Sequence, residues 1–252
     1  MNCHNGEKYL RKSLQSLILQ NYKNWELIFW NNCSSDNSKK IFNSLKDSRF
    51  KYYENNKLKN LYDVRNLAAS KAKGKYICFL DTDDWWVKTK LEKQIKLFLS
   101  DKKINFVYSN FFQFYQNSKK SKIFYKNILP EGIITQKLLD NYCIGVLTVM
   151  IKKKIFKDDI FDKFYNIIGD FEFFFRLSKK YKFRCVQEPL AYYRIHSNNY
   201  SKIKFNDHIK EYNYWLEKNK KIKENKKFSF NKIRIIKFKL IIKKFLRILN
   251  LI

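Results

Sequence analysis

Apolar residues recur along this chain at helical spacing in some stretches and gather in short continuous runs in others. Between residues 7 and 20 they recur at i, i+4, i+7 and i+8, beginning at Leu10, which predicts an amphipathic helix. The aromatic and β-branched run from Trp25 to Trp30 predicts a strand. We expect further helices at residues 37–45, 63–73, 88–99 and 170–181, and further strands at 49–54, 76–80, 104–114, 183–186 and 190–195. Gly74 is expected to end the helix at 63–73 as the residue after its C-cap. The alternation of strands and helices in the first 115 residues predicts an α/β fold with a mostly parallel sheet flanked by helices.

The C-terminal segment has a pattern of its own. Placed on a helix, residues 232–252 put six apolar side chains within one arc that contains no Lys or Arg. The arc consists of Ile235, Phe238, Ile242, Phe245, Leu246 and Leu249, and the opposite side carries Lys232, Lys237, Lys243, Lys244 and Arg247. Such a basic amphipathic helix is typical of segments that lie on an anionic membrane surface. The alternative is a helix that packs on the rest of the chain or on a partner.

The composition is that of a globular protein in a reducing compartment. The chain has 45% hydrophobic residues and only 5 Gly and 2 Pro, which favours a packed core. Its five cysteines are scattered and odd in number, which argues against a disulfide framework or a zinc ribbon. We find no secretory signal at the start and no apolar stretch long enough to span a bilayer. We therefore expect a cytoplasmic protein with a main domain at residues 1–200 and a basic helical extension at residues 201–252.

The net charge of +30 raises the question of an anionic partner. Amino acids that are encoded by AT-rich codons, such as Lys, Asn, Ile and Phe, are abundant throughout the chain. A genome of low GC content is therefore an alternative cause of the positive charge. Residues 202–252, however, carry 16 Lys and Arg against 4 Asp and Glu, a higher density than in the rest of the chain. Because no nucleic-acid-binding module is recognisable, we expect the tail to bind an anionic membrane and not a nucleic acid.

An acidic run is the first candidate for chemistry. Asp81, Asp83 and Asp84 follow directly after the apolar strand expected at residues 76–80. In open α/β sheets, ligands bind beyond the carboxyl ends of the strands. Clustered carboxylates repel one another unless a cation neutralises them, and hard oxygen ligands suit Mg²⁺ or Mn²⁺. The alternative is a solvated turn or helix start, where Asp is common.

The surroundings of this run resemble family 2 glycosyltransferases. The resemblance is carried by blocks that occur in the family's order between about residues 2 and 200. These blocks are Asn5–Leu10, Gln20–Ile28, Asn32–Ser38, Arg65–Asn66, Gly74–Trp86, Lys90–Gln94, Thr148–Ile151, Gly169–Glu172, Arg176–Leu177 and Tyr193–Asn199.

The resemblance implies a mixed GT-A fold and an enzyme of the hexosyltransferase type. It would transfer a sugar with inversion from a nucleotide-diphospho-sugar, with a UDP-sugar as the expected donor. The acceptor would be a hydroxyl of a cell-surface glycan or a lipid-linked saccharide. Because lipid-linked acceptors lie in membranes, we expect the protein at the inner face of the plasma membrane. By the same resemblance, Asp81 contacts the ribose or the metal, Asp83 is the main metal ligand and His196 completes a Mn²⁺ or Mg²⁺ site.

By the resemblance, Asp170 matches the catalytic base. A separate chemical argument points the same way, since a sugar hydroxyl needs a carboxylate within hydrogen-bond reach to accept its proton. The alternatives are that Asp170 only favours a helix N-terminus and that Glu172 is the base.

The resemblance also suggests the residues that bind the donor. Asn5 and Arg65 match positions near the nucleotide, and Arg194 is a candidate partner of the diphosphate because Arg suits phosphate geometry. Asn31 and Asn32 stand where the family usually has an Asp that recognises the base. An Asn side chain accepts and donates hydrogen bonds, so it retains part of this capacity.

The start of the chain departs from the family pattern. An apolar strand normally precedes the block at Cys3, but here only Met1 and Asn2 do, so we expect the first parallel strand to be missing or the start codon to lie upstream. This departure and the Asn31–Asn32 pair support an alternative function, a catalytically inactive, membrane-associated protein of the same fold that binds nucleotide or glycan.

Overall fold

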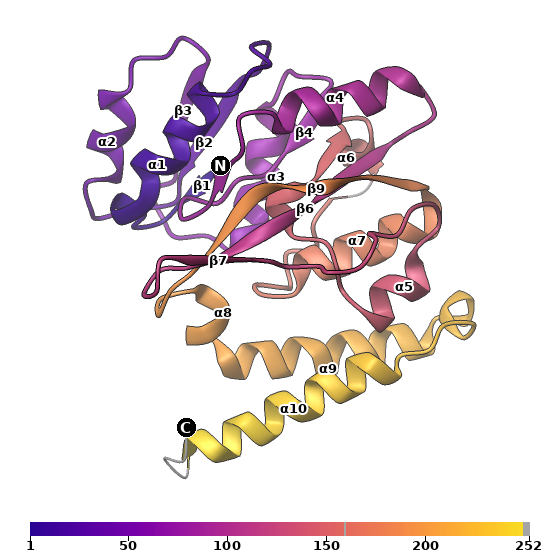
Figure 1. Cartoon of the computed structure of the whole chain (residues 1–252). Helices are drawn as coiled ribbons and strands as arrows, with labels where there is room; N and C mark the ends of the chain where they lie inside the picture. Colours follow the sequence, from indigo (N-terminus) through magenta and orange to yellow (C-terminus); the bar gives the residue numbers. More distant parts are fainter. Residues whose placement is uncertain (159, 249–252) are drawn as a thin grey trace.

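The computed structural model describes residues 1–158 and 160–248. A parallel three-stranded sheet forms the N-terminal part, shown in indigo and violet in Figure 1. Its strands, in spatial order, are β1 (Asn2–Cys3), β2 (Leu27–Asn31) and β3 (Phe50–Glu54). Helices α1 (Glu7–Ile18), α2 (Ser38–Ser44) and α3 (Leu61–Lys71) belong to the same part.

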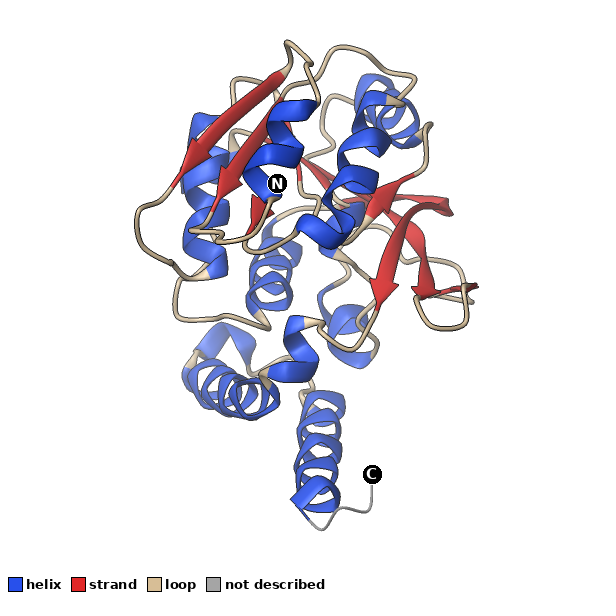
Figure 2. Ribbon diagram, turned by 90° about the vertical axis from the view of Figure 1, so that its left-hand side faces the viewer, coloured by secondary structure: helices blue, strands red, loops and turns tan. Residues whose placement is uncertain are grey.

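Strand β2 is buried on both faces, as expected for a parallel strand between helical layers. Leu27 and Phe29 point into a cluster shared with α1 and α2, while Ile28 and Trp30 meet Val64 of α3. Figure 2 shows helices on both sides of this sheet. The aromatic and β-branched run that predicted the strand is therefore continuous because neither face reaches water.

The second sheet is mixed, in agreement with the mixed sheet that the resemblance implies, whereas the first sheet is parallel throughout. The second sheet follows the order β4 (Tyr76–Cys78), β8 (Met150–Lys152), β6 (Phe106–Tyr115), β9 (Phe183–Ile195) and β5 (Trp85–Trp86), with β7 (Lys120–Ile123) paired to β6. Among the described strand pairs of this sheet, β6–β9 is parallel and the others are antiparallel. A tight connection such as that between β6 and β7 imposes an antiparallel pair, whereas parallel pairs need long crossovers.

Two local expectations change. The strands expected on either side of Pro189 form one strand, β9, whose pairing with β6 shifts register where Pro189 lies opposite Asn110. A bulge tolerates Pro because its missing N–H breaks no regular ladder bond there. Gly74 does not act as a C-cap glycine, because α3 ends in an extended Ala72 and the Gly74 N–H instead donates to Glu26 at 2.9 Å.

The first strand, expected to be missing, is present but has only two residues. Asn2 pairs with Trp30 and Cys3 with Asn31, parallel to β2. Strand β1 thereby leads into the loop that begins at His4, and its place beside β2 follows from the ladder bonds.

The remaining helices cover the second sheet and extend below it in Figure 1. They are α4 (Lys90–Ser100), α5 (Thr135–Asp140), α6 (Ile155–Asp158), α7 (Gly169–Lys180), α8 (Tyr200–Ile203), α9 (Phe205–Lys221) and α10 (Asn231–Ile248), with short 3-10 helices at η1 (Val146–Thr148) and η2 (Lys223–Asn225).

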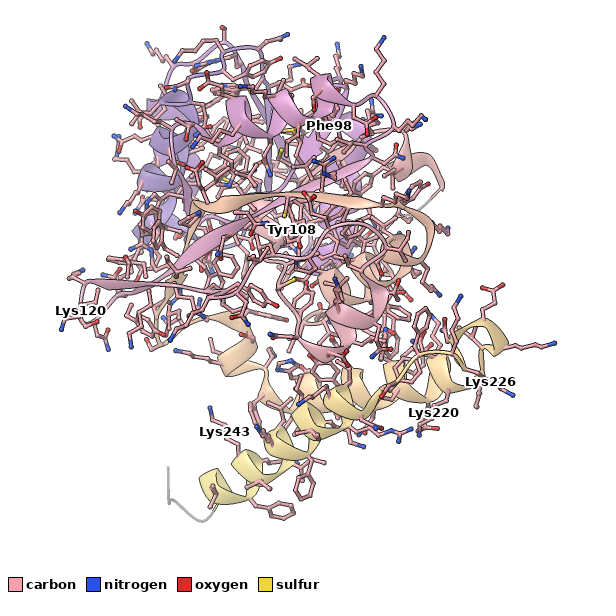
Figure 3. The ribbon with its side chains drawn as sticks, turned by 45° about the vertical axis from the view of Figure 1, so that its right-hand side comes forward. Phe98, Tyr108, Lys120, Lys220, Lys226 and Lys243 are labelled. Atoms are coloured by element: carbon pink, nitrogen blue, oxygen red, sulfur yellow. The ribbon has the colours of Figure 1, made fainter. Side chains whose placement is uncertain are left out.

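The C-terminal segment is built into the main core. Trp215 of α9 is fully buried, and Phe230 and Ile233 join it in the same cluster as Phe171 and Phe175 of α7. Figure 3 shows Tyr108 amid the side chains of the main body, Lys220 on α9, Lys243 on α10 and Lys226 in the connection between these two helices. The two sides of the boundary at residue 200 thus differ in charge density, but apolar side chains from both sides pack in one core.

Helix α10 packs on α9 along one edge and leaves the predicted apolar arc open. Ile233 is buried and Leu240 half-buried, whereas the exposed fractions of Phe238 and Phe245 are both 61%. Ile235 and Ile242 are also exposed. Leu249 and the side chain of Arg247 lie outside the described residues. None of the described helices has both the length and the apolar character needed to cross a bilayer.

Candidate active site

A cleft of about 560 Å³ brings together most of the residues singled out from the sequence. It lies beyond the C-terminal ends of β1 and β4, beside the N-terminus of α7 and the loop that leads to α8. The predicted site residues that line it are Asn5, Asn32, Arg65, Asp81, Asp83, Asp170 and His196. Residues separated by up to 191 positions therefore face one cleft (from Asn5 to His196).

Asp81 and Arg65 form an ion pair at the wall of the cleft. Nη2 of Arg65 donates to both carboxylate oxygens of Asp81, at 2.8 and 2.9 Å. Burial disfavours the charge on Arg65, but the adjacent Asp81 carboxylate outweighs it and raises the pKa of Arg65. The pair holds the Asp81 carboxylate in one orientation while a third of it remains exposed, with a side-chain exposure of 32%.

Asp83 and His196 meet across the cleft although 113 residues separate them. Nε2 of His196 lies 3.0 Å from Oδ2 of Asp83, and the ring of Tyr9 supports the imidazole at 5.1 Å. Asn199 fixes the loop, because its carboxamide oxygen accepts the His196 N–H at 2.7 Å and its amide donates to the Arg194 carbonyl at 3.0 Å.

These side chains fit a hard divalent cation that shares its coordination with a substrate. In the described part of the chain, no three His, Cys, Asp or Glu side chains converge into a complete metal site. Mg²⁺ and Mn²⁺ are commonly held by one or two protein ligands, with waters and substrate phosphates completing the shell. Asp83 and His196 could supply two protein ligands of this kind. Arg65 holds the Asp81 carboxylate beside them at the wall of the cleft.

The three asparagines mainly organise the loops around the cleft. Oδ1 of Asn32 accepts from the backbone N–H of Lys59 at 3.0 Å, and its amide donates to the Lys59 carbonyl at 2.9 Å. Asn31 is buried and its amide donates to the hydroxyl of Tyr52 at 2.9 Å. Asn5 adopts a positive φ of 52° and its side-chain oxygen accepts from the Ser35 N–H at 2.8 Å. Asn31 lies behind the described lining of the cleft, whereas Asn5 and Asn32 belong to it.

Asp170 lies in the first turn of α7, with its carboxylate at the cleft and tyrosines on both oxygens. The Tyr142 hydroxyl donates to Oδ2 at 3.2 Å, and the Tyr62 hydroxyl lies 3.4 Å from Oδ1. The Phe171 N–H also donates to Oδ1 at 2.8 Å. Burial raises the pKa of Asp170, and the positive charge of Arg65 and these hydrogen bonds oppose that rise. The result is a positioned carboxylate whose proton affinity exceeds that of an exposed Asp.

Gly169 makes this arrangement possible. A Cβ at this position would lie 2.4 Å from the Tyr62 ring, so only glycine lets the ring pack against the start of α7. Tyr62 in turn accepts the Asp170 N–H at 3.0 Å. The glycine thus sets the distance between α3 and the candidate base.

Two residues considered from the sequence point elsewhere. Glu172, the alternative base, is buried outside the described lining of the cleft, and its Oε1 accepts from Nε of Arg176 at 2.7 Å. Arg194 is buried behind the cleft, where its Nε donates to the Asp83 carbonyl at 2.7 Å. The backbone N–H of Arg194 donates to Asp84 at 2.8 Å, which ties β9 to the acidic loop.

Sequence reasoning missed the supports of the site. Tyr62 and Tyr142 carry no motif that marks them as partners of Asp170. Glu211 of α9 is another such support, because its carboxylate accepts the backbone N–H groups of Asn166, Ile167 and Ile168 at 2.7 to 2.9 Å. Glu211 lies on the buried face of the amphipathic helix α9. A charged residue on an apolar face is the one feature of the sequence that could have marked Glu211 as a support of the site.

Comparison with known proteins identifies the family. The sequence model described as "Glycosyl transferase family 2" matches residues 1–165 of this chain. The chain belongs to glycosyl transferase family 2. The resemblance found in the sequence is thereby confirmed, and with it the class of enzyme.

Two glucosyltransferases from Escherichia coli are similar over much of the chain. The UDP-Glc:alpha-D-GlcNAc-diphosphoundecaprenol beta-1,3-glucosyltransferase WfaP is 32% identical over 213 residues, which cover 84% of this chain and 82% of WfaP. The glucosyltransferase WfgD, of the same description, is 37% identical over 155 residues, which cover 62% of this chain and 59% of WfgD.

Solved structures confirm the mixed α/β fold of this family. Residues 1–349 of TarS from S. aureus in complex with UDP superpose with a TM-score of 0.64 at 17% identity, covering 84% of this chain and 63% of TarS. The mannosyltransferase PcManGT from Pyrobaculum calidifontis, in complex with GDP-Man and Mn²⁺, superposes with a TM-score of 0.60 at 11% identity, covering 86% of this chain and 62% of that protein. At these identities the likeness concerns the fold.

Proposed function

We propose that this protein transfers a sugar, with inversion, from a UDP-sugar to a hydroxyl of a lipid-linked saccharide. The observation that carries the proposal is the shared cleft, in which the Asp170 carboxylate faces the same space as Asp81, Asp83 and His196. The two similar E. coli proteins, whose names specify UDP-Glc and a diphosphoundecaprenol-linked GlcNAc, support the choice of donor and acceptor class.

On the donor side, Asp83 and His196 would hold a Mn²⁺ or Mg²⁺ ion. The ion, when bound, would neutralise the charge that develops on the diphosphate leaving group. Arg65 holds the Asp81 carboxylate through two hydrogen bonds, in a position where it would contact the ribose or the ion. Asn5 and Asn32 would contribute to nucleotide binding from the loops they hold. Arg194 contributes indirectly, through the backbone of Asp83.

On the acceptor side, Asp170 would act as the general base. It would accept the proton of the acceptor hydroxyl as that oxygen attacks the anomeric carbon and the bond to the diphosphate breaks. One displacement of this kind inverts the anomeric configuration. The raised pKa of Asp170 makes it a stronger base than an exposed Asp, and Tyr142 and Phe171 hold its oxygens in place.

The C-terminal helix would bring this cleft to the membrane that carries the acceptor. The exposed apolar arc on α10 is accompanied by exposed Lys232, Lys239, Lys243 and Lys244. Apolar side chains bury part of their surface in a bilayer interface, and basic residues are attracted to anionic lipid. This arrangement supports peripheral association with the inner face of the plasma membrane.

The role of the base is tested by separating transfer from donor binding. Asp170→Asn should leave the affinity for the nucleotide sugar nearly unchanged and lower the transfer rate by about 10²-fold or more, because the amide does not accept a proton. Glu172→Gln is the matched control and should retain most of the rate, since Glu172 lies outside the cleft lining. The measurements are nucleotide release and donor titration.

The same experiment separates the enzyme from the alternative, an inactive binding protein. Donor binding by the wild type without any release of nucleotide, in the presence of a GlcNAc-diphospholipid acceptor and Mn²⁺, would favour the binding protein. Loss of transfer in Glu172→Gln with near-normal transfer in Asp170→Asn would show that the base is assigned to the wrong carboxylate.

A further inference from the structure

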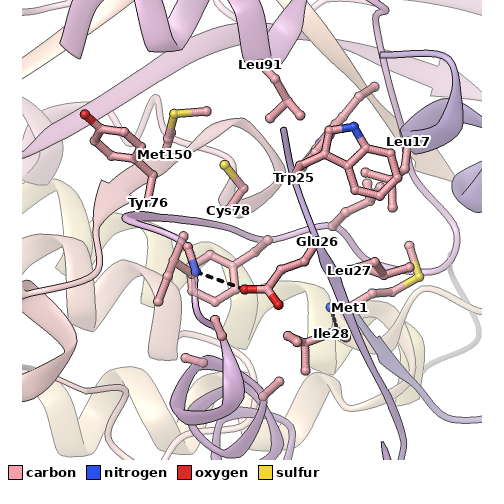
Figure 4. A pocket seen from close by; sticks show the side chains of 18 of the residues that line it. Met1, Leu17, Trp25, Glu26, Leu27, Ile28, Tyr76, Cys78, Leu91 and Met150 are labelled. Carbon is pink, nitrogen blue, oxygen red and sulfur yellow. Dashed lines mark hydrogen bonds between the residues drawn. The ribbon is translucent and has the colours of Figure 1, made fainter. Parts of the chain in front are cut away.

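The two described cavities differ in where their apolar side chains lie. The cavity of about 380 Å³ between the sheets, shown in Figure 4, is lined by buried side chains such as Leu17, Leu27 and Met150. The catalytic cleft instead has large apolar side chains at its rim that are open to water. Leu58 and Tyr200 belong to its lining and have exposed fractions of 60% and 49%. Single exposed apolar side chains are common on proteins, so their surroundings decide whether they mark a contact surface.

Two segments at this rim share one pattern, an exposed aliphatic residue between two exposed lysines. The first is Lys-Leu-Lys at residues 57–59, in the loop before α3, and the second is Lys-Ile-Lys at residues 202–204, at the end of α8. Residues 58 and 59 line the cleft, and residues 202–204 directly follow two lining residues, Tyr200 and Ser201. Ile203 at the centre of the second segment has an exposed fraction of 61%. We call these segments the 57–59 tip and the 202–204 tip.

The lysine ammonium groups retain donors for an outside partner. Nζ of Lys59 lies 3.8 Å from Oδ2 of Asp63, which also pairs with Lys163 at 2.9 Å. Nζ of Lys202 donates to the His196 carbonyl at 3.0 Å. An ammonium group has three N–H donors, so neither contact occupies the whole group. Both tips therefore present positive charge at the rim of the cleft.

The 202–204 tip is continuous with the exposed half of α10. Phe205, the next residue, begins α9, and Nζ of Lys243 on α10 lies 6.0 Å from the centroid of its ring. In Figure 1, α8 and the C-terminal end of α10 lie at the same end of the helical pair α9–α10. The exposed Ile242 precedes Lys243, and the exposed Phe245 follows it by two positions. Apolar and basic side chains thus extend from α10 to the rim.

A bilayer suits this arrangement better than a folded partner does. A stable protein interface covers roughly 800 Å² on each partner, in one contiguous patch. Each tip offers only one aliphatic side chain between two charges. The interface of an anionic bilayer takes up separate apolar side chains and attracts the lysines beside them. A lysine can also keep its ammonium group among the headgroups while its methylene stem lies deeper.

We propose that the 57–59 tip and the 202–204 tip insert into the surface of an anionic bilayer and hold the mouth of the catalytic cleft against it. The contact adds to that of α10 and fixes the orientation of the cleft, because three separate elements define a plane. One consequence rests on the proposed function: the lipid of the acceptor stays in the bilayer while its sugar hydroxyl reaches Asp170.

Vesicle binding in the absence of donor and acceptor tests the tips independently of catalysis. The probe is a vesicle of equal parts phosphatidylglycerol and phosphatidylcholine, titrated against the full chain. Leu58→Gln combined with Ile203→Gln should lower the partition coefficient by about tenfold or more, since both aliphatic contacts are lost.

Leu99→Gln is the matched control for vesicle binding. Leu99 has an exposed fraction of 72% but lies on α4, outside the described lining of the cleft, so this variant should bind like the wild type. A double variant that binds like the wild type would overturn the proposal, and so would an equal loss in Leu99→Gln. Binding to soluble poly-glutamate that the double variant loses, with its vesicle binding retained, would overturn the membrane contact and indicate an acidic protein partner.

Transfer then connects the tips to the acceptor. Ile203→Gln alone should lower the rate on a GlcNAc-diphospholipid in the same vesicles by about threefold or more and leave the rate on a soluble acceptor analogue unchanged, because Ile203 lies outside the described lining of the cleft. An equal loss of both rates would overturn the role of this tip in membrane contact. A wild type that transfers to neither acceptor would overturn the proposed function, while vesicle binding would still decide whether the tips contact the bilayer.

Discussion

The carboxylate of Asp170 depends on residues from three separate segments. Tyr62 comes from α3, Tyr142 from the loop after α5, and the Phe171 N–H from the first turn of α7. Burial alone would favour the protonated acid, and the donors and the nearby Arg65 favour the carboxylate. The pKa of Asp170 is therefore set by burial, which raises it, and by the hydrogen bonds and the Arg65 charge, which lower it.

This balance predicts the pH dependence of transfer. Because burial raises the pKa of Asp170, the rate should fall as the pH decreases through a value above about 3.9, the ordinary pKa of Asp. Tyr142→Phe removes a hydrogen bond that favours the ionised form, so it should move the acidic limb of kcat/KM to higher pH. Tyr214→Phe, at an exposed position outside the described lining of the cleft, is the control. A shift of the limb to lower pH in Tyr142→Phe would contradict this account.

Gly169 provides a steric test of the same site. Gly169→Ala places a Cβ 2.4 Å from the Tyr62 ring, so the ring or the start of α7 must move. We expect a loss of stability of about 1–3 kcal/mol and a lower transfer rate. Gly74→Ala is the control, because its nearest neighbour would lie at an ordinary 3.5 Å, and its stability should change by about 0.5 kcal/mol or less. Denaturant midpoints and nucleotide release measure both, and equal behaviour of the two variants would rule out the steric role.

At the scale of secondary-structure elements, α9 links the C-terminal segment to the catalytic cleft. Trp215 anchors the helix in the core beside Phe171 and Phe175 of α7. Glu211, one turn earlier, accepts three consecutive backbone N–H groups of residues 166–168. These residues lead directly into Gly169 and Asp170, so α9 fixes the approach of the chain to the candidate base.

Glu211→Gln should therefore affect catalysis. The amide side chain has one acceptor oxygen where the carboxylate has two, and it loses the charge that strengthens the bonds. We expect a transfer rate lowered by about tenfold, which corresponds to about 1.4 kcal/mol, with donor affinity nearly retained. Glu217→Gln, whose exposed carboxylate accepts only from Lys220 among the described contacts, is the control. An unchanged rate in Glu211→Gln would show that the loop is held by other contacts.

At the scale of the whole molecule, the basic and apolar surfaces of the C-terminal pair face away from the core. Helix α10 crosses below α9 in Figure 1 and extends beyond the body in Figure 2. Its first turns belong to the core through Ile233, while Phe238, Ile242 and Phe245 are exposed further along. Leu240 also packs against the core, so a truncation that tests membrane binding without loss of core contacts must begin after residue 240.

The membrane prediction compares apolar and basic contributions. Replacing Phe238, Ile242 and Phe245 by Ser should release the protein from anionic vesicles more completely than replacing Lys239, Lys243 and Lys244 by Gln. Activity on a soluble acceptor analogue should survive in both, since the cleft is formed by residues before 202. High salt should weaken vesicle binding only in part, because apolar burial is not screened. Vesicle flotation measures the outcome, and equal binding of the apolar variant and the wild type would exclude the membrane role.

The sequence by itself determined most of the alternation of strands and helices in the first 115 residues and the residue types of the site. The period of apolar residues identified α1, α4 and α7 because burial of one face is a local property of the chain. The acidic run after an apolar strand marked Asp81 and Asp83, and the order of blocks marked Asp170.

The tertiary structure decided which of these residues meet. Arg65 pairs with Asp81 and Asp83 with His196, while Glu172 turns away, and each outcome depends on how distant elements pack. The same holds for the antiparallel pairs of the second sheet and for the joining of α9 to the core. An apolar face requires a partner but does not specify one, because the free energy of burial is non-directional; shape, register and hydrogen bonds over the whole chain select the partner.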